Sequence, residues 1–463
     1  MNHAEVFQLD IHCVAHLYCN KNGDKQNSIH KNYQTHNKHI MKKILLSICL
    51  LITITTIKAQ ETVYPAPPQQ GNIALTHATI HIGNGQVIQD GMIVFSNGKI
   101  MSVGPTEPIK DNAKIIDCSG KQIYPGLISA ATNLGLNEIG AVRSTRDEYE
   151  LGDINPNVRS VIAYNTDSKI INTVRDNGIL LVNVIPNGGI ISGSSSVMQL
   201  DGWNWEDAVY KMDGGIHFRM PFVVRFSEND DPLKDALKKI EDVRTFFREA
   251  KAYFDEPKHE HTNLKFEAVK GLFDKTQTFF VHCELVKEMM IAVEFAKEFG
   301  FRTVIVGGSD SWKITDYLKE NNIAVIVNQM HSLPNMQDDD VDLPYKLPYL
   351  LQQAGVMYCI SDQDEQSRYR NLPFNAGVAS GYGLTKEQAL QAITLNAAKI
   401  LGIDNKTGTL ETGKDANIVV SDGDILDMKT SNVKYAFIQG RQLNLDDKQK
   451  QLYEKYKYKY GVK

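Results

Sequence analysis

Four side chains with metal-binding or acid–base chemistry follow apolar runs in the second half of the chain. His282 lies in the run 278–283, Glu284 comes directly after it, His331 follows the run 324–330, and Asp362 follows the run 356–361. Residues two apart in a continuing strand point to the same side, which would place His282 and Glu284 together. Imidazole and carboxylate groups are common ligands of zinc and manganese. The pattern therefore predicts a candidate site for one divalent metal ion.

Each of these residues also has a structural interpretation. A histidine at a strand end is often a core residue, and Glu284 suits the first turn of the following helix, where negative charge is favourable. Asp362 could cap a helix or form an ion pair with Arg368 or Arg370. The sequence leaves both interpretations open.

Three further polar motifs favour surface roles. His259-Glu260-His261 follows a charged stretch with no strand before it, which predicts a solvated loop. The acidic run 338–342 lacks the spacing of an EF-hand and also predicts a solvated loop. The Gly/Ser-rich segment 188–196 is interpreted as a loop that either lines a ligand pocket or makes a tight turn.

Strands and helices alternate around the candidate residues, which indicates an α/β fold. Strands are predicted at 178–186, 196–200, 278–283, 303–308, 324–330 and 356–361, and helices at 284–299 and 385–401. Continuous apolar strands of this kind suit a parallel sheet buried on both faces. Residues 72–124 and 408–440 have β-rich patterns with Gly and Asn turns, and residues 226–265 predict a charged helical insertion.

The composition is that of a globular protein. The 463 residues include 42% hydrophobic and 23% charged residues, with a formal net charge of −5, so no basic footprint for nucleic acid is present. Six cysteines are sparse, and three of them fall before residue 60, which argues against a disulfide framework.

The segment from Met41 has the pattern of a secretory signal peptide. Lys42 and Lys43 precede an apolar run, and Ala59 supplies a small residue at the expected cleavage site. We therefore predict a signal peptide over 41–59, a polar upstream extension over 1–40 that is not part of the native protein, and a periplasmic or secreted product.

Three segments together resemble the amidohydrolase superfamily, in its secreted imidazolonepropionase-like or dipeptidase-like bacterial branch. They are the β-meander ending at 121–128 (KQIYPGLI), the segment 390–401 (LQAITLNAAKIL), and the segment 408–419 (GTLETGKDANIV). The resemblance implies a (β/α)₈ TIM-type barrel over 125–405 and a composite β-sandwich from 60–124 and 406–445, followed by a Lys/Tyr-rich tail over 446–463. It also implies a site at the carboxyl ends of the strands, where zinc or another divalent metal activates a water.

The resemblance breaks down at the metal ligands. The family has Asp-x-His-x-His after strand one, whereas this chain has Ser129-Ala130-Ala131-Thr132-Asn133, so Ala131 and Asn133 replace both histidines. The strand-six histidine is replaced within 307–310 (GGSD). His282 matches the strand-five ligand, and Asp362 matches the strand-eight aspartate, which in the family binds metal and accepts a proton. Together with His331, these two residues form the expected metal site.

Three functions remain open at the level of sequence. The first is hydrolysis of amide, cyclic amide or dipeptide-like carbon–nitrogen bonds through a metal-activated water. The second is a catalytically inactive protein that binds a small molecule or assembles with an active paralogue, and the third is a structural subunit. Homo-oligomers and hetero-oligomers fit each of them, and the loss of the His-x-His pair favours the second.

Overall fold

The computed structural model describes residues 63–109, 112–223, 231–328, 330–362 and 368–462. The predicted extension (1–40) and signal peptide (41–59) lie outside the described residues. Within those residues, no helix combines the length and apolar composition that crossing a bilayer requires.

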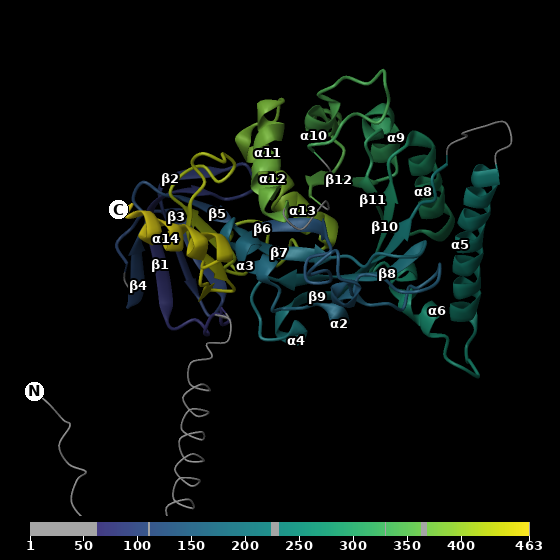
Figure 1. Ribbon diagram of the computed structural model, residues 1–463, viewed down its shortest axis with the longest axis horizontal. Coiled ribbons are helices and arrows are strands. Elements are labelled where there is room, and N and C mark those ends of the chain that lie inside the picture. Colours follow the sequence, from purple (N-terminus) through teal and green to yellow (C-terminus); the bar gives the residue numbers. More distant parts are fainter. Residues whose placement is uncertain (1–62, 110–111, 224–230, 329, 363–367, 463) are drawn as a thin grey trace, which may run out of the picture. The chain divides into compact units, whose positions relative to one another are not determined.

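One sheet of eight strands follows the order of the chain (Figure 1). The strands are β6 (Leu127–Thr132), β7 (Ile179–Val184), β8 (Ile191–Gln199), β9 (Val209–Arg219), β10 (Thr278–Cys283), β11 (Thr303–Gly307), β12 (Ala324–Val327) and β13 (Tyr358–Ile360). β7, β11, β12 and β13 are buried along their whole length, as their apolar sequences predict.

The sheet curls until its two edges meet at Ser361. The Ser361 hydroxyl accepts a hydrogen bond from the Ala131 N–H and donates one to the Ala131 carbonyl, both at 3.0 Å. This single side chain links β6 to the end of β13. The sheet is therefore a nearly closed, TIM-like barrel, as the resemblance implies.

β8 runs antiparallel to both β7 and β9, whereas every other pair in this sheet is parallel. Only residues 185–190 connect β7 to β8, and a parallel crossover needs about a dozen residues or more. The loop predicted over 188–196 is wrong in its second half, because Gly193–Ser196 lie within buried β8. A Cβ on Gly193 would lie 2.4 Å from the Val158 carbonyl oxygen, so close packing explains the glycine.

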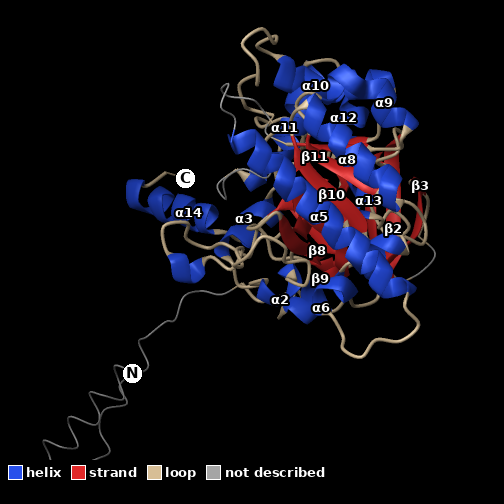
Figure 2. Ribbon diagram, turned by 90° about the vertical axis from the view of Figure 1, so that its right-hand side faces the viewer, coloured by secondary structure: helices blue, strands red, loops and turns tan. Residues whose placement is uncertain are grey.

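Helices pack around the barrel strands (Figure 2). They are α2 (Ser160–Ala163), α3 (Lys169–Asp176), α4 (Trp205–Ala208), α5 (Asp231–Asp255), α6 (Leu264–Ala268), α7 (Lys270–Phe273), α8 (Val286–Phe299), α9 (Thr315–Glu320), α10 (Leu343–Ala354), α11 (Leu372–Gly381), α12 (Lys386–Ala392) and α13 (Leu395–Leu401), with 3₁₀ turns at Arg143–Thr145, Ser311–Ile314 and Tyr369–Asn371. The predicted charged helical insertion is α5 with the loop after it. The predicted helix over 385–401 divides at Thr394 into α12 and α13.

A second sheet combines segments from both ends of the described chain. Its strands are β1 (Asn72–His81), β2 (Val87–Ser96), β3 (Lys99–Pro105), β4 (Ala113–Asp117), β5 (Gln122–Pro125), β14 (Ile418–Ser421), β15 (Val433–Ile438) and β16 (Arg441–Gln442). β14 pairs antiparallel with β5 and so joins the two sets of strands. The tail forms a helix, α14 (Lys448–Tyr460), whose first turn is capped by the Asp447 carboxylate.

Candidate functional site

Two histidines from adjacent strands meet near the carboxyl ends of the barrel strands. His217 on β9 is fully buried, and its Nδ1 lies 2.9 Å from Nε2 of His282 on β10. The His217 ring stacks on Phe280, with centroids 4.8 Å apart and planes 8° apart. The pair is therefore held in place by the stacking of His217 on Phe280 and by one imidazole–imidazole hydrogen bond.

Both imidazoles are neutral at physiological pH. Burial lowers the pKa of His217 well below its ordinary value, and the positive charge of Arg219 lowers it further. The pKa of His282 is lowered by the same two causes and by His217 itself. Neutral imidazoles can exchange a hydrogen bond with each other and with a ligand, but with such low pKa values they are weak proton acceptors.

Sequence reasoning identified His282 but missed His217. Gly215, His217 and Arg219 alternate along β9 with Ile216 and Phe218, and this alternation is the signal that could have identified it. Arg219 donates to the Ser192 hydroxyl at 3.1 Å and to the side-chain oxygen of Asn187.

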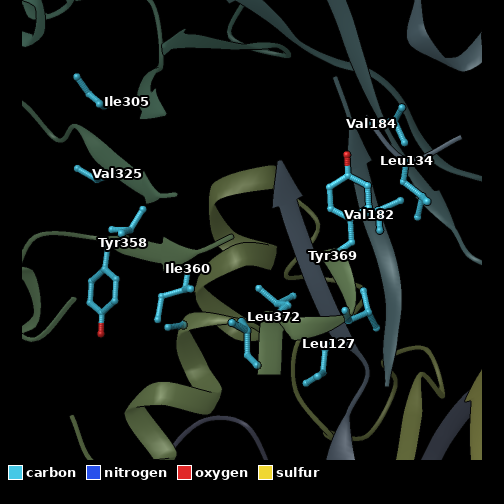
Figure 3. Close-up of a cluster of buried hydrophobic side chains, with 14 of the residues drawn as sticks. Leu127, Leu134, Val182, Val184, Ile305, Val325, Tyr358, Ile360, Tyr369 and Leu372 are labelled. Atoms are coloured by element: carbon cyan, nitrogen blue, oxygen red, sulfur yellow. The ribbon is translucent and has the colours of Figure 1, made fainter. Parts of the chain in front are cut away.

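Asn133 occupies the position of the second family histidine, and both ends of its amide are used. Its oxygen accepts a hydrogen bond from the Tyr369 hydroxyl, and its nitrogen donates to the Glu148 carboxylate. Figure 3 shows Tyr369 in the buried cluster that also contains Val182 and Val184. Asn133 thus links the end of β6 to the segment after β13.

Glu148 is 3% exposed and accepts hydrogen bonds from the loops that follow β6 and β7. Besides Asn133, the donors are the amides of Asn137 and Asn187, each at 3.0 Å, and the guanidinium of Arg146 at 3.2 Å. Four donors satisfy a buried carboxylate and so stabilise its charge. Glu148 therefore organises the strand-end loops where the family would have histidine ligands.

Glu284 points toward the turn after β11. Its carboxylate accepts hydrogen bonds from the N–H of Ser309, at 3.0 Å, and from the Ser309 hydroxyl. Burial raises the pKa of Glu284. The expectation that Glu284 starts the next helix is wrong, because Glu288 caps α8 by accepting from the N–H groups of Glu284 and Leu285.

Gly307 begins the segment 307–310, in which the resemblance predicts a strand-six histidine, and the structure leaves no room for a side chain at this glycine. A Cβ on Gly307 would lie 2.2 Å from Oε1 of Glu284, and its φ of +102° is unfavourable for a residue with a side chain. The Glu284 carboxylate occupies the space that a side chain at position 307 would need.

The other two predicted ligands lie in different surroundings. Asp362 is 2% exposed and accepts a hydrogen bond from the Asn375 amide at 3.0 Å. His331 is exposed, and its ring packs edge-on against Tyr345 with centroids 5.5 Å apart. The metal-binding roles of His282, His331 and Asp362, and the proton-accepting role of Asp362, stay predictions.

The two motifs assigned to solvated loops lie at the surface. His259 stacks on Tyr253 at 3.6 Å between centroids, while Glu260 and His261 are exposed. In the acidic run, Asp340 and Asp342 both pair with Lys346, at 2.5 and 3.2 Å. Charged side chains in both motifs are thus held by local contacts.

The donor set does not fit the metal centre that the family implies. Ala131 has no ligand atom, the Asn133 amide is committed at both ends, and Gly307 replaces the strand-six ligand. Across the described ranges, no three or more His, Cys, Asp or Glu side chains gather as a metal site requires. What remains is a pair of neutral imidazoles beside a hydrogen-bonded polar network.

Comparisons with known proteins agree with the fold. Residues 356–443 match the model of the Amidohydrolase family. An imidazolonepropionase of Thermoplasma volcanium is 44% identical over 73 residues, which cover 15% of this chain and only 18% of that protein. An imidazolonepropionase of Staphylococcus aureus is 22% identical over 371 residues, covering 73% of this chain and 84% of the relative.

A solved structure is similar over a longer span. The crystal structure of an amidohydrolase from Thermotoga maritima superposes with a TM-score of 0.72 and 26% identity, covering 80% of this chain and 99% of that one. The resemblance to the amidohydrolase superfamily is thereby confirmed. The chain has the barrel of a family of generally metal-dependent hydrolases.

Proposed function

We propose that this chain is an exported amidohydrolase-superfamily protein that binds a small molecule, or assembles with an active homologue, without carrying out metal-dependent hydrolysis. The observation that carries the proposal is the double hydrogen bonding of Asn133, between Tyr369 and Glu148. An amide held on both sides is not free to turn toward an ion. Neutral Asn is also a poor zinc ligand compared with His or carboxylate.

The His217–His282 pair supplies the binding chemistry in this proposal. His282, held by the buried His217, and the nearby Arg219 offer hydrogen bonds to a polar ligand, and the lowered pKa of His282 keeps it from acting as a strong base. The similarity to proteins named imidazolonepropionase supports a ligand with a ring amide or a related carbon–nitrogen bond.

Hydrolysis through a rearranged metal site is the second candidate. His282 and Asp362 are retained at the two positions that match the family, and the described fold places each at the end of a barrel strand. A metal held there would supply a Lewis acid and an activated water.

Metal content distinguishes the two candidates. The full chain would be expressed with its own leader and recovered from the cell envelope fraction and the medium, and its N-terminus would be read by mass spectrometry. We expect wild-type protein to contain far less than one zinc or manganese per chain after incubation with either ion. The double variant Ala131→His/Asn133→His is the matched comparison, because it restores the missing pair of imidazoles.

One metal per wild-type chain, lost in Asp362→Ala, would refute the proposal and establish the second candidate. Near-zero metal in the wild type, with metal gained in the double variant, would support the proposal. A wild-type chain that co-purifies with a homologue retaining His-x-His would identify the partner form of this function.

A further inference from the structure

A cationic hollow lies at the opposite end of the barrel strands from His282. Its volume is about 340 Å³. The residues lining it come from the amino-terminal ends of β11 and β12, from α9 and α13, and from the turns before β12 and β13.

The charge of this hollow is one-sided. Arg302, Lys319 and Lys399 line it, and no carboxylate is among its lining residues. Within the described residues, none of these three side chains forms an ion pair, unlike the cations of α5 and of the acidic run 338–342. Three cations around one hollow repel one another until an anion neutralises them.

Two of the three cations form hydrogen bonds with the carboxyl ends of helices. Arg302 donates through Nη2 to the carbonyls of Lys399 and Ile400, at 2.7 and 3.1 Å, and Lys319 donates weakly to the Ala354 carbonyl at 3.4 Å. Both contacts are favourable at the carboxyl ends of α13 and α10. The partial charge of a helix end is about half an elementary charge, so it does not neutralise a full cation.

A fourth cationic side chain, Lys211, increases the positive charge near the end of α13. Lys211 donates to the Leu401 carbonyl at 2.8 Å, and a Cβ built on Gly402 would lie 3.0 Å from its Nζ and 3.2 Å from Nη1 of Arg302. The two cationic groups thus approach the same point at the end of α13. Burial, and the positive charges of Arg302 and Lys406, lower the pKa of Lys211.

The floor of the hollow is apolar. The buried side chains of Val304, Ile323, Ala324 and Ile400 contribute to its lining. An apolar floor beneath a cationic rim suits an organic anion better than a bare ion, and the volume lies in the range of small-molecule pockets. We propose that this hollow is a binding site for a small organic anion with phosphate or carboxylate groups, contacted by Arg302, Lys319 and Lys399.

The site is independent of the proposed function at the carboxyl ends of the strands. It needs no metal and none of the residues around His282. Failure of either proposal would leave the other untouched.

Calorimetric titration of the full chain tests this site with two probes, pyrophosphate and succinate. We expect saturable binding of one of them with one site per chain, weakening with added salt. The double variant Lys319→Gln/Lys399→Gln removes two charges and keeps Arg302 at the end of α13, and we expect its affinity to fall at least about tenfold. Melting temperature confirms that the variant is folded.

The matched control is Lys238→Gln/Lys429→Gln, which removes two exposed lysines that lie outside the hollow. Loss of binding in the first variant and not in the control supports the proposal. Preference for pyrophosphate indicates a phosphate ligand, and preference for succinate indicates a carboxylate ligand. Equal losses in both variants, or no saturable binding of either probe up to ~10 mM, would overturn it.

Discussion

The Tyr369 hydroxyl donates a hydrogen bond to the side-chain oxygen of Asn133, across the seam where the first and last barrel strands meet. Tyr369 is 3% exposed, and its ring lies in the main hydrophobic cluster. Asn133 stands at a position where the family has a metal-binding histidine. In this protein it therefore joins the two edges of the sheet.

Removing that hydroxyl tests its role. Tyr369→Phe leaves the buried oxygen of Asn133 without this donor, and we expect the free energy of unfolding to fall by about 1–3 kcal/mol. Urea denaturation measures the loss. Tyr458→Phe, at a side chain that is 91% exposed, is the control and should change stability by less than about 0.5 kcal/mol. Equal stability of the two variants would remove the structural role assigned to Asn133.

The Ser361 bridge gives a second prediction. Ser361→Ala abolishes both hydrogen bonds to the Ala131 backbone and should lower the free energy of unfolding by about 1–3 kcal/mol. Ser311 is equally buried, but its hydroxyl has no partner among the described residues. Ser311→Ala should therefore be neutral or slightly stabilising in the same denaturation experiment, and a loss as large as that of Ser361→Ala would contradict the comparison.

The contact between Gly307 and Glu284 gives a third. Gly307→Ala places a Cβ against the Glu284 carboxylate and forces a strained φ, so we expect a loss of more than about 2 kcal/mol. Gly413 has a similar φ of +88° with nothing within 4 Å of its Cβ position. Gly413→Ala isolates the backbone strain and should cost only about 1 kcal/mol.

A double-mutant cycle then locates the clash. Glu284→Ala removes the carboxylate, so Gly307→Ala should cost less in that background than in the wild type. Strict additivity of the two substitutions would show that Glu284 does not fill the space beside Gly307.

The neutral histidine pair predicts a dependence of stability on pH. In the unfolded chain, His217 and His282 regain ordinary pKa values near 6.5. Below that pH the unfolded state therefore binds protons at these two histidines that the folded state does not bind. Stability should therefore fall as pH decreases below about 6.5, by up to about 1.4 kcal/mol per pH unit for each histidine.

Urea denaturation between about pH 5 and pH 8 measures this slope. His217→Gln should flatten it, although the variant is less stable at every pH. His331→Gln is the matched control, because it removes a histidine that lies outside the buried pair. A slope that is the same in all three proteins would show that other groups cause the acid sensitivity.

The sequence was most informative where hydrophobic pattern and local turns decide the structure. The apolar runs that became β10 to β13 and the charged helix α5 were predicted from their own residues. The Gly and Asn turns predicted within 72–124 include Asn97-Gly98, and both residues adopt the positive φ that such a hairpin needs.

Long-range contacts explain what was missed. The antiparallel direction of β8 follows from a short connection that the pattern of strand residues does not show. Glu148 and Asn133 lie 15 positions apart through an irregular loop, and no motif marks their contact. Glu284 was predicted to start a helix because acidic residues are common in a first helical turn. Glu288, four positions inside that predicted boundary, makes the capping contacts instead.

Closure of the barrel through Ser361 also limits when this protein can fold. Ala131 and Ser361 are 230 positions apart, and β5 gains its partner β14 only from residues 418–421. The barrel sheet cannot close until residue 361 has been synthesised, and β5 stays without β14 until residues 418–421 have been synthesised. Contacts of such long range slow folding and leave unpaired strand edges exposed to aggregation. Until its C-terminal strands have been synthesised, the chain therefore exposes β-strand edges that the folded protein covers.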